Sequence, residues 1–231
     1  MKKKLLELLT VAFILFCNFA NAQNKTTEIG ISGSPSITTI FGTRGKAITG
    51  YSGGIILQQN LNKRLSIHTN LSYERKGFSK YGHYQDVGYH PYGYGFHTAV
   101  NQFDYLSTAI LLRANTGNKL KFFVNAGPFI SYLIKASSNV LYEGSASKES
   151  LVQTKNVMRF DYGGTLGLGL SVPIKSKLAI SCELRENFGI QNISADANKN
   201  STGYNLGGNI TTNSINLLFA ITYKISKNNK I

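Results

Sequence analysis

The stretch that decides the fold is residues 159–172, which read Arg-Phe-Asp-Tyr-Gly-Gly-Thr-Leu-Gly-Leu-Gly-Leu-Ser-Val. Every second residue from Phe160 to Val172 is apolar or glycine, and the residues between them are small or polar. Side chains alternate across a β-strand, so the stretch has two opposite faces, and a tilted strand of roughly 10 residues crosses a bilayer. Glycine, threonine and serine on the polar face suit the confined interior of a narrow barrel, whereas a soluble sheet would carry charge there.

The same alternation recurs along the rest of the chain, with no helical period, no linker and no second domain. It predicts eight strands, at residues 28–40, 50–61, 65–76, 103–115, 119–134, 159–173, 178–190 and 214–224. Tight turns are expected at residues 62–64, 116–118 and 175–177, and long connections elsewhere. An even strand number with short turns at one end and long loops at the other is typical of outer-membrane barrels. The predicted fold is all-β, an eight-stranded antiparallel up-and-down transmembrane β-barrel with both termini in the periplasm.

Hairpin register tests this interpretation, because directly opposed residues must share a face. Across the turn at 62–64 the expected partners are Ile55 with Leu71, Gln58 with His68 and Ser52 with Glu74. Across the turn at 116–118 they are Leu112 with Phe122, Ile110 with Val124 and Thr108 with Ala126. The turn at 175–177 sets Gly167 and its small neighbours opposite Glu183 and Arg185.

The apolar face is predicted to meet lipid, because its aromatic residues gather near the strand ends. Those near the long loops are Tyr51, Tyr73, Tyr132, Phe160, Tyr162 and Phe188, and those near the opposite end are Phe122 and Tyr223. Aromatic residues at two levels, with aliphatic residues between them, form the interfacial girdles of a membrane barrel.

The polar face is predicted to fill the lumen, since eight strands enclose space for side chains but not for a water-filled channel. Its charged residues are expected to form one connected salt-bridge network, because an unpaired charge in a closed interior costs several kcal/mol. The members of this predicted network are Glu74, Lys76, Arg113, Asp161, Glu183 and Arg185.

The first 22 residues have the three parts of a secretory signal. Three lysines precede a short apolar stretch, which ends at a small-x-small cleavage site, Ala20-Asn21-Ala22. We expect residues 1–22 to be a cleaved signal peptide and residues 23–231 to be one outer-membrane barrel domain. Its removal would also remove Cys17 and leave Cys182 as a single cysteine, so no intrachain disulfide is expected.

The basic character of the chain indicates an anionic partner. Lysine and arginine number 25 against 11 acidic residues, and without Lys2, Lys3, Lys4 and Glu7 the balance is 22 against 10. The positive residues sit in turns, loops and the tail, not on a helix or among stacking aromatic residues, so nucleic acid is not expected. Charges at strand ends favour outer-membrane lipid and lipopolysaccharide as partners, for a barrel expected to be monomeric.

Three motifs resemble the PorT-like outer-membrane beta-barrel domain family. They are Tyr73-Glu74-Arg75-Lys76-Gly77, Asn125-Ala126-Gly127-Pro128 and Asp161-Tyr162-Gly163-Gly164, and the similarity extends over about residues 28–224. The resemblance implies a small eight-stranded barrel, and one branch of the family is implicated in a secretion pathway of the outer membrane. It implies no catalytic residues and no cofactor.

Two groups of residues could carry chemistry. His83, His90 and His97 are evenly spaced in a Tyr/Gly-rich segment and could bind zinc or copper, but they lack a metal-ligand spacing motif. Ser66, His68 and Glu74 share the inner face and could be named as an esterase triad, although such residues are also ordinary lumen filling. Neither group is expected to be functional, and no enzyme activity is predicted.

The sequence therefore predicts an integral outer-membrane barrel of structural, adhesive or accessory-secretion type. Its long external loops would contact a secretion-machinery or surface partner, and its polar lumen would be plugged. Two alternatives stay open: a lipid-modifying barrel enzyme, and a soluble periplasmic barrel that carries a small apolar ligand with its faces reversed.

Overall fold

A computed structural model describes residues 26–42, 45–85, 94–117, 119–142, 148–152, 154, 157–194 and 210–225. The predicted signal peptide lies outside this part of the chain. The described residues form nine strands: β1 (Thr27–Phe41), β2 (Lys46–Asn60), β3 (Leu65–Gln85), β4 (Tyr94–Thr116), β5 (Lys121–Tyr142), β6 (Lys148–Val152), β7 (Phe160–Pro173), β8 (Leu178–Gly189) and β9 (Thr211–Ile225). Within the same residues, no helix is long and apolar enough to cross a membrane.

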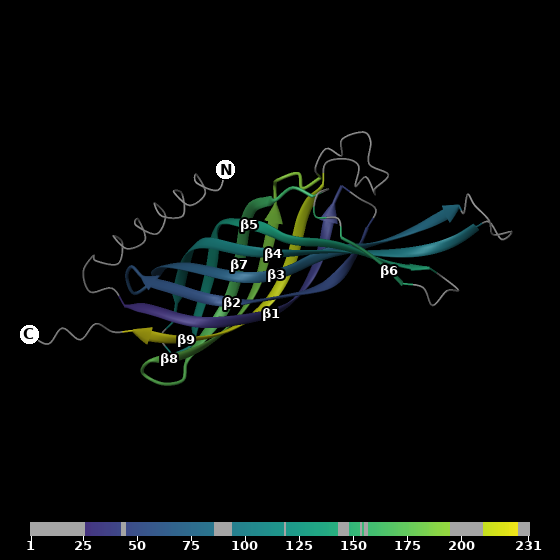
Figure 1. Ribbon diagram of the computed structural model, residues 1–231. Coiled ribbons are helices and arrows are strands. Elements are labelled where there is room, and N and C mark those ends of the chain that lie inside the picture. Colours follow the sequence, from purple (N-terminus) through teal and green to yellow (C-terminus); the bar gives the residue numbers. More distant parts are fainter. Residues whose placement is uncertain are drawn as a thin grey trace, which may run out of the picture.

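Eight of these strands form a closed antiparallel barrel (Figure 1). Each strand pairs with its neighbour in the chain, except that β5 pairs with β7, and β9 returns to pair with β1. Closure leaves the barrel without a free edge, so its backbone groups are bonded to one another, as lipid requires. The predicted up-and-down barrel is confirmed. The ninth strand, β6, pairs with β5 outside the barrel.

The two faces of the barrel have the predicted polarity. On β7, Leu166, Leu168 and Leu170 point outward, and Leu168 has 62% of its surface exposed. Asp161 and Thr165 point into the lumen and are buried. A soluble carrier of an apolar ligand would need the reverse arrangement, so that alternative is contradicted.

The barrel has two unlike ends, which we call the turn end and the loop end. The turn end holds the connections at residues 61–64, 117–120 and 174–177, together with the start of β1 and the finish of β9. In the first turn, the side-chain oxygen of Asn62 accepts hydrogen bonds from the backbone N–H groups of Arg64 and Leu65, both at 2.8 Å. Such an Asx turn reverses the chain within a few residues.

Two of the three predicted hairpin registers are confirmed. Gln58 lies opposite His68, and Gly167 lies opposite Arg185. The β4–β5 register is wrong by four residues, because Leu112 lies opposite Ala126 and not Phe122. Gly117 takes a positive φ of 92° and the turn continues to Leu120. Each residue of β4 therefore pairs with a residue of β5 that lies four positions later than expected.

At the loop end the structure differs from expectation in two ways. The connection between β1 and β2, expected to be long, spans only residues 42–45 because both strands extend and Gly42 turns the chain with a φ of 88°. Conversely, β3, β4 and β5 continue well beyond their predicted ends. The Tyr/Gly-rich segment predicted as a loop therefore supplies strand residues, which is consistent with the high strand propensity of tyrosine.

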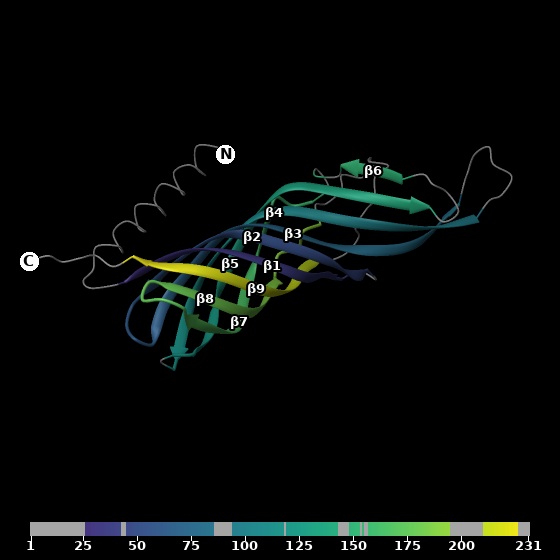
Figure 2. The ribbon, with the colours of Figure 1, turned by 90° about the horizontal axis from the view of Figure 1, so that it is seen from below.

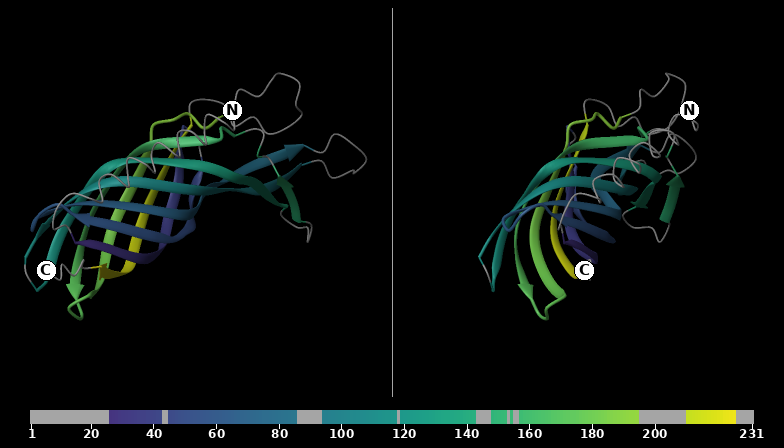
Figure 3. Two further views of the ribbon diagram at one scale, coloured as in Figure 1. Left: turned by 60° about the vertical axis from the view of Figure 1, so that its left-hand side comes forward. Right: turned by 90° about the vertical axis from the view of Figure 1, so that its left-hand side faces the viewer.

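These long strands extend beyond the barrel as a continuation of its sheet, visible at one side of Figure 1 and from below in Figure 2. We call it the projecting sheet; it consists of residues 80–85 of β3, 94–102 of β4, 135–142 of β5 and all of β6. The register of β4 and β5 shifts between Asp104 and Tyr105, where Ile134 and Lys135 are both exposed. A bulge bends a strand, and its place at the rim explains why the sheet turns away from the barrel wall (Figure 3).

The outer surface carries aromatic residues near the loop end, as predicted. Tyr132 and Phe160 lie edge to face with ring centroids 5.4 Å apart, and Tyr51 and Tyr73 lie 6.1 Å apart. Arg75 stacks over Tyr51 and forms a bidentate ion pair with Asp104, at 2.6 and 3.1 Å. This mixture of rings and charge is suited to a membrane–water interface.

We predict that Leu168→Arg destabilises the folded barrel by about 2–4 kcal/mol, because it places a cation near the bilayer midplane. Val172→Arg, on the same face but next to the turn end, should cost only about 0–1 kcal/mol. Reversible urea unfolding in lipid vesicles measures both values. Equal costs for the two variants would contradict the lipid-facing assignment.

Candidate functional site in the barrel lumen

All six residues of the predicted charge network lie in the lumen and are buried. They do not form one salt-bridge network. Among the described residues their ion pairs make two clusters: Glu74, Lys76 and Asp161, which we call the loop-side cluster, and Arg113, Glu183 and Arg185, the turn-side cluster. Arg113 pairs opposite Ser66, eight positions along β3 from Glu74, which is roughly 26 Å of extended strand. Arg113 is therefore too far from Glu74 for a direct ion pair, whereas Arg185 lines the same small cavity as Glu74 but forms its ion pair with Glu183.

The loop-side cluster is centred on Lys76. Its ammonium nitrogen lies 3.5 Å from both the Glu74 and the Asp161 carboxylates and 4.8 Å from the centre of the Phe129 ring. Hydroxyl groups also donate hydrogen bonds to these carboxylates: Ser107 and Ser214 donate to Glu74 at 3.0 and 3.2 Å, and Thr212 donates to Asp161 at 2.7 Å. One ammonium and two carboxylates give this cluster a formal charge of −1.

The turn-side cluster is centred on Glu183. Arg185, two residues further along β8, donates to both of its oxygens at 2.7 and 3.0 Å, and Arg113 reaches it at 3.4 Å. Gly167 leaves the space for this carboxylate, since a Cβ atom there would overlap the Glu183 carboxylate oxygen. Two guanidinium groups and one carboxylate give a formal charge of +1, which offsets the charge of the loop-side cluster.

Arg113 is held by further partners from two strands, β2 and β5. It donates to Asn125 at 2.9 Å and to Gln58 at 2.8 Å, and its guanidinium stacks 3.9 Å from the centre of the Phe123 ring. The alternation that placed Arg113 in the lumen also places these neutral partners there. Sequence reasoning nevertheless missed them, because hydrogen-bond partners across a barrel depend on how the strands curve around it.

The two clusters are joined by hydrogen bonds. Asn216 contacts the Ser214 hydroxyl at 3.3 Å and the Arg185 carbonyl at 3.5 Å, and Ser214 donates to Glu74. Between the clusters lies a polar cavity of about 20 Å³, which suffices for one water molecule. The buried Asn70 carbonyl oxygen, which has no partner among the described residues, lines it. Side chains therefore fill the middle of the lumen.

At the loop end the lumen is closed by apolar residues. We call this group the apolar cap; it consists of Ile40, Phe78, Phe103, Tyr105, Leu133, Ala136, Val157, Ile193 and Ile210. Three of these, Val157, Ile193 and Ile210, lie outside the long strands and were not predicted. The connections that carry them bond to each other, with Met158 donating to the Ile193 carbonyl and Ile193 donating to the Ile210 carbonyl, both at 2.9 Å. The cap is thus fastened across the barrel mouth.

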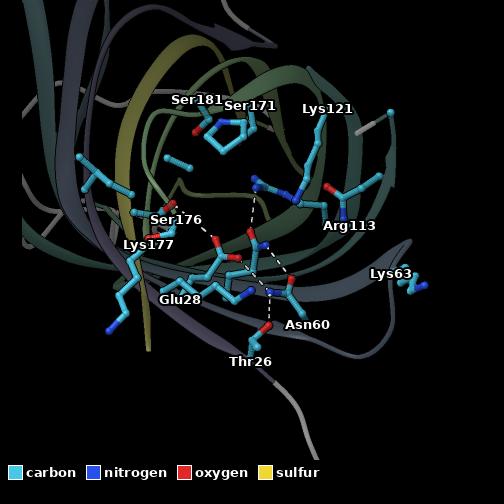
Figure 4. Close-up of a pocket in the computed structure, with 18 of the residues that line it drawn as sticks. Thr26, Glu28, Asn60, Lys63, Arg113, Lys121, Ser171, Ser176, Lys177 and Ser181 are labelled. Atoms are coloured by element: carbon cyan, nitrogen blue, oxygen red, sulfur yellow. Dashed lines mark hydrogen bonds between the residues drawn. The ribbon is translucent and has the colours of Figure 1, made fainter. Parts of the chain in front are cut away.

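At the turn end the lumen opens into a cavity of about 640 Å³, which we call the vestibule. Figure 4 shows Thr26, Glu28 and Asn60 joined by hydrogen bonds along one wall, with Lys121 and Arg113 at another. Lys63 and Lys177 lie at its margin (Figure 4). Arg113 is also part of the turn-side cluster, so the vestibule ends where the filled part of the lumen begins.

The esterase triad considered above is not assembled. Ser66 accepts a hydrogen bond from Asn115 at 3.3 Å, and His68 contacts Arg185 at 3.4 Å. Glu74 is held by the loop-side cluster. Each of the three side chains thus has other partners.

The metal hypothesis falls on residues that the structure does not describe in side-chain detail. His90 and the side chains of His83 and His97 lie outside the described residues. Among the side chains that are described, no group of three His, Cys, Asp or Glu is placed to hold a metal ion.

Residues 19–195 match the family described as "Outer membrane protein beta-barrel domain". The chain belongs to this family. The barrel is accordingly an outer-membrane protein, and the exposed apolar band described above is its lipid-facing surface. No match is found among curated proteins.

Several solved barrels are similar in structure at low sequence identity. The outer membrane protein OprG from Pseudomonas aeruginosa has a TM-score of 0.46 and 8% identity, over 88% of this chain and 96% of that chain. Ail, the attachment invasion locus protein of Yersinia pestis, has a TM-score of 0.44 and 13% identity, over 88% and 100%. Neisserial surface protein A has a TM-score of 0.43 and 11% identity, over 86% and 97%.

We predict that Lys76→Met destabilises the barrel more than Arg185→Met. Lys76 is the single cation of its cluster, so its loss strands two buried carboxylates and should cost about 3–5 kcal/mol. Arg185→Met leaves Glu183 paired with Arg113 and should cost less. Urea unfolding in vesicles measures both.

The matched control neutralises the whole loop-side cluster. The triple variant Glu74→Gln, Lys76→Met, Asp161→Asn should recover much of the stability lost in Lys76→Met alone, because no buried charge remains unpaired. If the triple variant is less stable than Lys76→Met, charge stranding is not the cause.

Proposed function

We propose that this protein is a non-conducting, non-enzymatic outer-membrane barrel that acts through its projecting sheet as a structural, adhesive or accessory-secretion component. In this proposal it is a PorT-like member of the family. The observation that carries the proposal is the contrast between a lumen filled across its middle and loop end and three strands that continue far past the barrel rim.

The filled lumen supports a role other than transport. A solute crossing the barrel would have to displace the apolar cap and then both charge clusters. Moving the cap exposes nine apolar residues, and moving the clusters breaks buried ion pairs. Eight-stranded barrels leave no aqueous channel once such side chains are in place.

The projecting sheet supports a role in protein contact. It carries exposed Tyr81, Leu141 and Val152, and Val152 has 67% of its surface exposed. Exposed tyrosine and aliphatic residues on an extended sheet offer contact area with little loss of side-chain freedom. The partner of this surface would be a component of a secretion machine or a surface ligand.

The remaining features of the proposal concern the membrane. The barrel would act as a monomer, with lipid and lipopolysaccharide around it and no nucleic-acid partner. Lysines and arginines at both rims support contact with anionic head groups. A lipid-modifying activity is the second candidate, and it has less support because Ser66, His68 and Glu74 are separately engaged.

The test is to shorten the projecting hairpin and leave the barrel intact. Replacing residues 81–98 by Asn-Gly keeps the Lys80–Ala99 pair and closes it with a two-residue hairpin turn. The variant should fold, as heat-modifiable gel mobility reports, and should lose the adhesive or secretion phenotype of the intact protein. A triple variant at the turn end, Lys121→Gln, Lys175→Gln, Lys224→Gln, serves as a control that should keep that phenotype. A shortened variant with full phenotype would refute the role of the sheet, and steady channels in planar bilayers would refute the filled lumen.

A second prediction concerns orientation, because the loop end is proposed to face the cell exterior and the termini the periplasm. In a Cys182→Ala background, a membrane-impermeant maleimide added to intact cells should label Lys80→Cys and not Ser176→Cys. Permeabilised cells should show labelling at both positions, which controls for reactivity. Labelling of Ser176→Cys alone in intact cells would invert the orientation.

A further inference from the structure

The proposed function leaves the vestibule at the turn end without a role. Its volume of about 640 Å³ lies within the roughly 300–1,000 Å³ of typical small-molecule sites. It is open at the turn end and ends at Arg113 inside the barrel. A molecule could therefore enter it from one side only.

The charge of the lining is strongly one-sided. Five lysines and one arginine line the cavity against a single acidic residue, Glu28, which gives a formal balance of +5; the basic residues are Lys63, Arg113, Lys121, Lys175, Lys177 and Lys224. None of the five lysines forms an ion pair with any residue that the structure describes.

Glu28 offsets one unit of this charge and is held by neutral partners. Its carboxylate accepts hydrogen bonds from Asn60 at 2.9 Å and from Thr222 at 3.5 Å, and Asn60 in turn donates to Thr26 at 3.0 Å. These neutral partners hold the carboxylate against the wall (Figure 4). Like charges crowded around a concavity repel one another, and a cleft lined by one sign of charge concentrates ions of the opposite sign.

We propose that the vestibule binds a small molecule that carries two or more phosphate groups. Lysine ammonium groups are rotatable point charges that bind phosphate, and a phosphate group carries up to two negative charges where a carboxylate carries one, so several unpaired lysines favour phosphate. The one arginine in the cavity is already engaged by Asn125, Gln58 and Glu183. The unpaired donors of the site are therefore lysines, with hydroxyl and amide groups such as Ser171, Ser181 and Asn115 between them. The phosphate could belong to a soluble molecule or to a lipid head group that folds over the rim.

The proposal is tested by calorimetric titration of the full-length barrel, in a neutral maltoside detergent, with inorganic tripolyphosphate. The protein should bind tripolyphosphate with an affinity that falls as salt is added, and it should bind citrate more weakly. Equal affinity for citrate would overturn the preference for phosphate, and no binding at low salt would overturn the site.

A set of charge-matched variants locates the site. The triple variant Lys121→Gln, Lys175→Gln, Lys224→Gln should bind tripolyphosphate roughly tenfold or more weakly, because it removes three cations from the cavity. Lys46→Gln, Lys80→Gln, Lys135→Gln removes the same charge from the loop end and should bind as the unmodified protein does. Equal weakening in the two triple variants would show non-specific attraction and overturn the proposal.

A third variant should gain affinity, a result that misfolding does not produce. Glu28→Gln removes the single acidic residue from the lining, so tripolyphosphate should bind several-fold more tightly. Weaker binding by Glu28→Gln would contradict the electrostatic basis of the site.

The lipid composition of the micelles distinguishes a lipid head group from a soluble molecule as the source of the phosphate. If cardiolipin, whose head group carries two phosphates, weakens tripolyphosphate binding more than an anionic fatty acid that gives the micelles the same charge, lipid head groups occupy the vestibule. If cardiolipin does not, the ligand is a soluble phosphorylated molecule. Both outcomes support a phosphate site, and neither depends on the proposed role of the projecting sheet.

Discussion

The rest of the structure depends on the hydrogen-bonded closure of β1 against β9. This pairing joins the first and last described strands, from Thr27 opposite Ile225 to Phe41 opposite Thr211. In lipid an open sheet edge would leave a row of backbone N–H and C=O groups without partners, at several kcal/mol each. Closure removes both edges at once. It also fixes which side chains are sealed inside, so the lumen and its chemistry follow from it.

A sealed lumen of eight strands explains the arrangement of its charges. Where side chains fill the lumen, a lone carboxylate or ammonium would lack solvation, so each buried charge is held by opposite charges and polar side chains. Lys76 forms ion pairs with two carboxylates, from β3 and β7, and Glu183 forms ion pairs with two guanidinium groups, from β4 and β8. The clusters carry formal charges of −1 and +1, so together they are neutral. Glycine at position 167 makes the necessary room on the opposite strand.

The two ends of the barrel are built differently, and this asymmetry gives the molecule its functional possibilities. The loop end is sealed by the apolar cap, and the sheet that projects beyond it departs at a bulge in β5. The turn end is open, polar and basic. A barrel of this kind offers a protein-binding surface on one side and a ligand-sized cavity on the other, with no passage between them. The charge clusters separate these two regions.

The sequence by itself determined the features that depend on local geometry. Alternation along single strands assigned the lipid-facing and lumenal sides, and all six lumenal charges were placed on the correct face, because side chains of a strand alternate regardless of context. The tight turns at 61–64 and 174–177 set their registers, since few pairings are compatible with so short a connection. The β4–β5 register was missed because a slip of four residues keeps every side chain on its own face, so alternation could not detect it.

Only the tertiary structure decided the features that depend on where the strands lie around the barrel. Lys76 and Asp161 are 85 positions apart in the chain, and their contact exists because closure brings β3 and β7 to face each other across the lumen. The grouping into two clusters follows from where each side chain lies around and along the barrel, which strand alternation does not encode. In the sequence, Val157, Ile193 and Ile210 are isolated apolar residues in the connections. They are buried because these connections fold over the barrel mouth. The vestibule likewise collects lysines from two separate turns and from β5 and β9, and their shared cavity is a property of the closed barrel alone.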